Sequence, residues 1–208
     1  MPKLRVHVTI TLDGYIAGPG QRLEDPLGEG GTRMHEWVFA AWEDRRSGKG
    51  GLDVEVLDRA DANIGATIMG RNMFGPVRGE WPDESWRGWW GEEPPYHHDV
   101  FVLTHHTRPD LPMAGGTTFH FTDEPIERVL ERAFAAADGR DVRLGGGAAA
   151  IQQYLSAGLV DELELSIAPL LLGGGERLLD NVGTTMAGYR VTEMVSSAAA
   201  THARLVRK

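Results

Sequence analysis

Three consecutive glycines, Gly145 to Gly147, carry the clearest chemical signal in this sequence. They follow a short apolar strand and lead directly into an alanine-rich helix that begins at Ala148. The first backbone N–H groups of a helix have no intrahelical acceptor, and the helix dipole makes that end positive. Glycines also leave the approach free of side chains, so the run favours a phosphate-binding turn. A glycine turn that serves only to reverse the chain is an open alternative.

The residues after this turn predict the elements that position it. Ile151, Tyr154 and Leu155 continue one apolar helix face, and Gly158 is a typical helix C-terminal cap. From Val160 to Pro169 apolar and polar residues alternate, which predicts a strand. Strand, turn, helix and strand form a βαβ unit, whose crossover brings the glycine turn to the carboxyl edge of a parallel sheet, where ligands commonly bind.

Similar patterns elsewhere in the chain predict the rest of the fold. Strands are expected at residues 4–12, 66–69, 99–104 and 117–121, helices at residues 34–42, 52–62 and 125–137, and an antiparallel hairpin at residues 189–195 and 201–206. The first of these helices is expected to bury Met34, Trp37, Val38, Ala41 and Trp42. The alternation predicts an α/β fold with a mostly parallel central sheet, helices on both faces and a C-terminal antiparallel hairpin.

Three glycine-rich or irregular segments interrupt these elements. Residues 15–31 are expected to form a long loop, and Gly173 to Gly175 a turn. Residues 75–98 hold Trp81, Trp86, Trp89 and Trp90 without a clean period, and so much aromatic area argues against disorder. This segment is interpreted as a lid, a surface that stacks on a flat substrate, or a homodimer interface.

Length and composition limit the function classes. A chain of 208 residues suits one domain spanning 1–208, and it holds no apolar run of the roughly 20 residues that a membrane span needs. The formal charge of −9 disfavours nucleic acid as a partner. The first residues lack a cleavable signal, so we expect a cytoplasmic protein.

The sequence also disfavours several kinds of catalytic site. There is no cysteine, which excludes thiolate nucleophiles and cysteine-bound metals. The histidine pairs at 97–98 and 105–106 resemble metal ligands, but adjacent side chains on extended backbone point apart, so no metal site is expected. A Gly-x-Ser-x-Gly elbow is absent from the sequence, which disfavours a serine hydrolase.

Four ordered segments together resemble a known fold. These are residues 11–17 (TLDGYIA), 68–74 (IMGRNMF), 100–105 (VFVLTH) and 144–175, which runs from LGGG through GLVDEL to PLLLGGG. Their order and spacing resemble the dihydrofolate reductase-like fold, and most closely the family of riboflavin-biosynthesis reductase C-terminal domains. The resemblance covers residues 4 to about 180.

This resemblance implies a bound NADPH. Its diphosphate would lie on the triple-glycine turn, and its adenosine phosphate near Arg71, whose guanidinium fork suits a phosphate monoester, with Thr104 as a second contact. The implied cofactor-binding residues are Ile16, Ala17, Gly70, Arg71, Thr104, Leu144, Gly145, Gly146, Gly147 and Ala148. Met73 and His105 stand where classical dihydrofolate reductases carry other residues, so NADH and a deazaflavin remain alternative cofactors.

The resemblance further implies catalytic or substrate roles for Asp13, Glu36 and Ser166. An ordinary Asp-Gly turn, a solvent-facing glutamate and a surface serine are the respective alternatives. The implied activity is hydride transfer from a nicotinamide to a C=N or C=O bond of a small pterin-like or ribosylaminopyrimidine-like heterocycle, by a homodimer. The rival interpretations are a catalytically inactive nucleotide-binding or interaction module on the same fold, a deazaflavin-dependent reductase and a true folate reductase.

Overall fold

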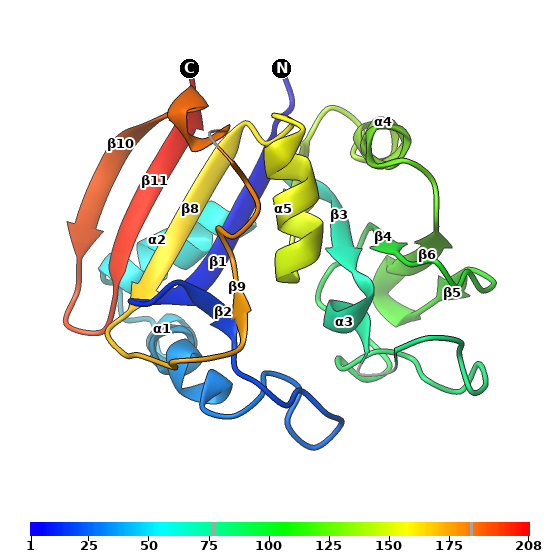
Figure 1. Cartoon of the computed structure of the whole chain (residues 1–208), viewed down its shortest axis with the longest axis horizontal. Coiled ribbons are helices and arrows are strands. Elements are labelled where there is room, and N and C mark those ends of the chain that lie inside the picture. The colour runs from blue at the N-terminus through cyan, green and yellow to red at the C-terminus, as the bar shows by residue number, and fades with distance from the viewer. Residues whose placement is uncertain (76–77, 184) are drawn as a thin grey trace.

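The computed structural model describes residues 1–75, 78–183 and 185–208, and it is built around one large sheet. The strands of this sheet are β1 (Leu4–Thr11), β3 (Ile64–Gly70), β4 (Asp99–Leu103), β5 (Leu111–Pro112), β6 (Thr118–Thr122), β7 (Asp141–Leu144), β8 (Glu162–Ala168), β10 (Tyr189–Ser196) and β11 (Thr201–Arg207). Their order is β10-β11-β8-β1-β7-β3-β4-β6-β5 (Figure 1).

The centre of the sheet is parallel and its edges are antiparallel. From β8 to β6 each neighbouring pair is parallel, whereas β10 pairs with β11 and β11 with β8 in antiparallel fashion. The predicted α/β class, mostly parallel sheet and C-terminal hairpin are therefore confirmed. A separate pair of short strands, β2 (Tyr15–Ala17) and β9 (Glu176–Arg177), lies in segments that the sequence analysis assigned to loops.

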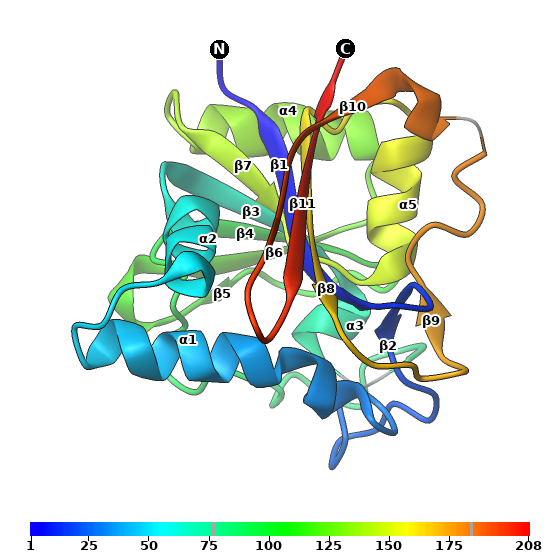
Figure 2. The same cartoon turned by 90° about the vertical axis from the view of Figure 1, so that its left-hand side faces the viewer.

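Helices cover both faces of the sheet, as predicted (Figure 2). They are α1 (Glu36–Arg46), α2 (Leu52–Asp61), α3 (Arg71–Phe74), α4 (Ile126–Ala136) and α5 (Ala148–Ser156). α4 and α5 pack on the larger apolar core, and α1 and α2 form a smaller cluster on the opposite face. Trp42 was expected in that cluster but is 45% exposed. Within α1 only Trp37, Val38 and Ala41 are buried, so a narrow stripe of this helix faces the sheet. Met34 is also buried, but it belongs to the preceding 3₁₀ turn (Gly31–His35).

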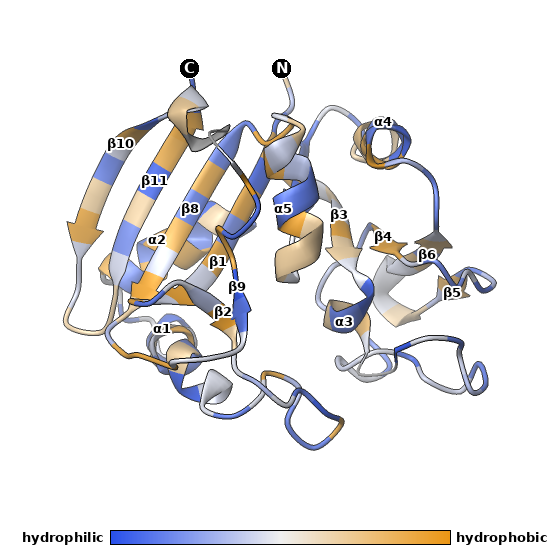
Figure 3. Ribbon diagram, viewed as in Figure 1, coloured by the Kyte–Doolittle hydropathy of each residue, from blue (hydrophilic) through white to orange (hydrophobic). Residues whose placement is uncertain are grey.

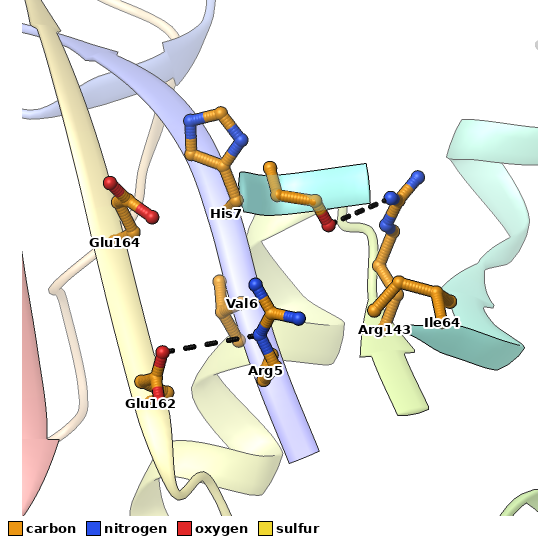
Figure 4. Close-up of a pocket in the computed structure, with 8 residues that line it drawn as sticks. Arg5, Val6, His7, Ile64, Arg143, Glu162 and Glu164 are labelled. Carbon is orange, nitrogen blue, oxygen red and sulfur yellow. Dashed lines mark hydrogen bonds and ion pairs between the residues drawn. The ribbon is translucent and has the colours of Figure 1, made fainter. Parts of the chain in front are cut away.

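The sheet face beneath α2 is unusually polar. On β1, Leu4, Val6 and Val8 point into the larger core, so Arg5 and His7 point to the α2 side, and the alternation is visible in Figure 3. Glu162 and Glu164 on β8 are each only 5% exposed, and arginines pair with both. Figure 4 shows the small pocket that these groups line, whose volume of about 10 Å³ suits a water molecule.

The tryptophan-rich segment packs against the large sheet of the same chain. Residues 78–98 contain no helix or strand, as predicted. Trp81, Trp86 and Trp90 cover a cluster that includes Phe74 and Phe119, on the face opposite α4. Trp81 lies edge-on to Phe74, with ring centroids 5.9 Å apart, and Trp90 stacks on Phe119. Much of the aromatic area in this segment is thus used within the chain.

None of the helices in the described part of the chain is long and apolar enough to span a bilayer.

Candidate functional site

A cleft lies at the carboxyl ends of β3, β4 and β7, beside the N-terminus of α5. It consists of two adjoining pockets, of about 410 and 340 Å³. The first is lined by the start of α5 and by Glu176 of β9, and the second by the segments that follow β4 and β6. Both are lined by Arg71, Asn72, Arg78, Leu103 and Gln153. This is the sheet edge at which the sequence predicted a ligand.

The glycine turn opens α5 toward the first pocket. Gly147 is the N-cap residue, and no side chain caps the helix, so the first-turn N–H groups that follow lack an intrahelical acceptor. Gly146 has φ +129° and accepts a hydrogen bond from Gly70 N–H, which fastens the turn to the end of β3. Gly145 N–H donates to Ile68 O at 2.8 Å. Gly145, which the resemblance placed among the cofactor-binding residues, therefore has no free amide to offer a phosphate, because β3 uses that donor.

Arg71 lies between the two pockets and has unsatisfied donors. Its Nη1 donates to Gly79 O at 2.5 Å and to Thr104 Oγ1 at 3.4 Å, and its guanidinium stacks 3.5 Å from the centroid of a Trp81 ring. Nε and Nη2 are buried and find no acceptor among the described residues. Burial, followed by repulsion from Arg108, lowers the pKa of Arg71.

Buried donor atoms without a partner on a partly exposed cation indicate that an acceptor is missing. A phosphate monoester fits, because it offers several oxygens and a negative charge to the guanidinium fork. The residues present therefore fit a dinucleotide with an adenosine phosphate, whose diphosphate would reach α5. This fit rests on the donor set of Arg71 and on the uncapped helix.

The structure brings together five of the residues expected to bind the cofactor. Gly70, Arg71, Thr104, Gly147 and Ala148 line one or both pockets. The others do not line them. Leu144 is fully buried in the core, Gly145 and Gly146 form the turn behind α5, and Ile16 and Ala17 lie on β2.

Comparisons with known proteins agree with this fold. A model of the RibD C-terminal domain matches residues 2–202 of the chain. The chain belongs to the RibD C-terminal domain family. A curated relative, the uncharacterized protein YyaP of Bacillus subtilis (strain 168), is 48% identical over 44 residues, which are 21% of this chain and only 23% of that protein.

Two solved structures show the same architecture. A putative riboflavin biosynthesis protein from Shewanella sp. PV-4 superposes with a TM-score of 0.63 at 20% identity, covering 99% of each chain. Dihydrofolate reductase from Enterococcus faecalis, complexed with NADP(H) and RAB-propyl, superposes with a TM-score of 0.54 at 15% identity, covering 99% of this chain and 96% of that one. They confirm the dihydrofolate reductase-like fold.

In this member of the family, the carboxylate of Asp13 is hydrogen-bonded to other groups of the same chain. Its carboxylate accepts hydrogen bonds from Thr11 Oγ1 at 2.5 Å and from the backbone N–H groups of Leu172 and Gly173, the latter at 2.7 Å. The hydrogen bond from Thr11 is the main cause of a lowered pKa of Asp13, and the two amides add to it. Asp13 fastens the end of β1 to the loop before β9.

Ser166 is fully buried beneath α1 and α2. Its Oγ is 2.9 Å from His7 Nε2 and 2.9 Å from His202 Nδ1, and His202 Nε2 lies 2.8 Å from Asp53 Oδ1. Trp37 packs edge-on against His202, with ring centroids 5.0 Å apart. The expected alternative of a surface serine is therefore wrong, since the hydroxyl is 0% exposed, and it lies apart from both cleft pockets.

Glu36 is the first residue of α1 and is exposed. It lines neither pocket of the cleft. Asp13 lies in the turn after β1, Glu36 on α1 and Ser166 on β8. Of the two carboxylates among these three residues, that of Asp13 accepts hydrogen bonds from the chain and that of Glu36 makes none within the described residues.

Sequence reasoning missed Arg78 and Glu176, which line the cleft opposite the helix terminus. Neither lies in a recognisable motif. The one available signal was the position of Glu176 directly after the predicted Gly173–Gly175 turn.

Replacing Asp13 with asparagine should loosen the loop at residues 170–178. An asparagine offers one acceptor oxygen and turns an NH₂ group toward donors that Asp13 now satisfies. We expect faster amide hydrogen exchange in this loop and a lower unfolding temperature, with exchange in α4 unchanged. The control is Asp138→Asn at a surface turn. Unchanged exchange at Leu172 and Gly173 in the Asp13 variant would refute this anchoring role.

Proposed function

We propose that the protein is an NAD(P)H-dependent reductase, with NADPH as the favoured cofactor. The observation that carries this proposal is the pairing of two anion sites in one cleft, the uncapped start of α5 and the unsatisfied guanidinium of Arg71. A dinucleotide phosphate carries a diphosphate and a separate phosphate monoester, which match the two sites. The solved dihydrofolate reductase with bound NADP(H) supports the assignment.

The substrate we propose is a small pterin-like or ribosylaminopyrimidine-like heterocycle, reduced at a C=N or C=O bond. Membership of the RibD C-terminal domain family supports this class. When bound, the nicotinamide supplies the hydride. The chain holds the cofactor through Arg71, Thr104 and the α5 amides, and it must deliver a proton to the reduced bond.

Glu36 is our candidate for contact with substrate, because its exposed carboxylate is available. Asp13 would act on the site by holding the loop before β9, and Ser166 by supporting the sheet beneath α1. A true folate reductase would require strong loss of activity in Glu36→Gln together with inhibition by folate analogues.

A nucleotide-binding module without turnover is the second candidate. Its support is that Asp13 and Ser166 are both satisfied by internal hydrogen bonds, so neither offers a free group to a substrate. Tight NADPH binding without NADPH oxidation across a panel of pterins and pyrimidines would favour the module. Steady oxidation with any of them would favour the reductase.

The deciding experiment is a parallel titration with NADPH, NADH and a deazaflavin, followed by tryptophan fluorescence. Trp81 stacks on Arg71, so occupancy of the cleft should change its emission. We expect saturable quenching by NADPH at lower concentrations than by NADH. Quenching by the deazaflavin alone would replace the proposed cofactor, and no response to any of the three would end the proposal.

We also propose that the protein works in the cytoplasm as a homodimer. The edge strand β10 supports a self-association surface, because Val191 and Met194 on it are 58% and 64% exposed. Light scattering at micromolar concentration should give twice the mass of one chain, and a monomeric mass would contradict this.

A further inference from the structure

An ion pair in the cleft faces the phosphate-binding helix. Arg78 Nη2 lies 3.4 Å from Glu176 Oε1 and 3.4 Å from Gln21 Oε1. With its amide oxygen turned toward Arg78, Asn72 accepts from Nη1 and Nη2 at 3.2 and 2.9 Å. Arg78 is otherwise exposed and lines both pockets. Its side chain can therefore reach either half of the cleft.

The second oxygen of Glu176 points to the start of α5. A Cβ placed on Gly147 would lie 3.6 Å from Glu176 Oε2, so the carboxylate stands at the N-cap. A negative charge at the positive end of a helix dipole is itself favourable. Glu176 therefore occupies the electrostatic position that an entering phosphate group would take.

The backbone around Glu176 is held in place on both sides. β9 pairs with β2, and Gln152 Nε2 of α5 donates to Arg177 O at 2.8 Å. The Arg177 side chain donates to Asp13 O at 3.0 Å, and Leu178 N–H donates to Gly14 O at 3.0 Å. A ligand can therefore displace the Glu176 side chain by rotating it, while its backbone stays beside the helix.

We propose that Glu176 is an internal competitor of the diphosphate, and that Arg78 is a diphosphate-binding residue that exchanges Glu176 for the ligand. This proposal rests on the proposed nucleotide site. The carboxylate repels an incoming diphosphate and releases Arg78 when it turns away, so the two side chains set the affinity of the α5 end for any diphosphate. Arg71, in contrast, binds only the adenosine phosphate.

Calorimetric titration with inorganic pyrophosphate, NADPH and NADH tests this role. Glu176→Gln should tighten the binding of all three by about five- to tenfold, because it removes one repelling charge at the helix terminus. Arg78→Gln should weaken all three by a similar factor. Glu43→Gln and Arg46→Gln, which change the same charges in an exposed ion pair on α1, should leave the three affinities unchanged.

Several outcomes would contradict the proposed roles of Glu176 and Arg78. Unchanged or weaker pyrophosphate binding by Glu176→Gln would show that its carboxylate does not compete. Weakening of NADPH alone by Arg78→Gln would assign Arg78 to the adenosine phosphate. If the unmodified protein binds pyrophosphate but neither nucleotide, the proposed function fails, while the pyrophosphate titrations of the variants still decide the roles of Glu176 and Arg78. If Glu176→Gln binds none of the three while the unmodified protein binds NADPH, the competitor role of Glu176 fails and the proposed function stands.

Discussion

Replacing Arg71 with alanine is expected to weaken NADPH binding by about 10- to 100-fold while changing NADH binding by less than about threefold. The variant removes Nε and Nη2, two buried donors with no acceptor among the described residues. Hydrogen bonds from a charged group contribute about 1.5–3 kcal/mol, which sets the expected range. NADH lacks the phosphate monoester that would satisfy these donors. Parallel fluorescence titrations with the two nucleotides measure the ratio directly.

Two further variants make this result interpretable. Arg71→Lys keeps the charge but loses the planar fork, so NADPH binding should fall to an intermediate value. Arg45→Ala removes an exposed arginine that pairs with Asp58 and Asp61 and lines neither pocket of the cleft. This variant should change neither affinity. Equal losses of NADPH and NADH in Arg71→Ala would instead indicate a general role for Arg71 in shaping the cleft.

The parts of the fold that local sequence determines were predictable. Three features are each set by residues close together in the chain: the alternation in β1 and β8, the apolar face of α5, and the end of that helix, where Gly158 follows the C-cap residue with φ +67°. The glycine turn was found for the same reason. The antiparallel pair of β2 and β9 was not, because neither strand is longer than three residues and each is stabilised by the other across about 160 residues.

The candidate site divides in the same way. The positions of Arg71 and Gly147 were predictable from local sequence, because Arg71 directly follows β3 and Gly147 directly precedes α5. The environments of Asp13 and Ser166 do not, because their partners lie 159 residues away, at Leu172 for Asp13 and at His7 for Ser166. A hydroxyl on an alternating strand can face substrate or a buried partner, and only the packing of α1 and α2 on that face decides between them.

The buried face beneath α2 should also make the protein sensitive to acid. Burial, and then the positive charge of Arg143, lowers the pKa of His7 to about 3 from an ordinary value of 6.5. Figure 4 shows His7, Glu164 and Arg143 around the same small pocket. Between pH 6.5 and 3 the unfolded chain binds a proton at this histidine and the folded chain does not. Stability contributed by neutral His7 is therefore complete above pH 6.5 and is lost as the pH falls toward 3.

We expect this loss to reach about 3–5 kcal/mol in the free energy of unfolding near pH 3. Other groups titrate in the same range, among them His98, whose pKa burial lowers to about 4. The contribution of His7 is therefore best isolated as a difference between two proteins. His7→Gln keeps an N–H donor near Ser166 but cannot titrate, so its unfolding free energy should fall less steeply between pH 6 and 4, by about 1.4 kcal/mol per pH unit.

Urea unfolding at half-unit pH steps measures both slopes, with the exposed His105→Gln as the matched control. A variant that is merely destabilised would shift the whole curve downward at every pH and keep its slope. A change of slope confined to pH 6–4 requires that the folded protein exclude one proton that the unfolded chain accepts. Parallel curves for His7→Gln and the unmodified protein would mean that His7 is protonated in the folded state, and that water reaches the polar layer beneath α2.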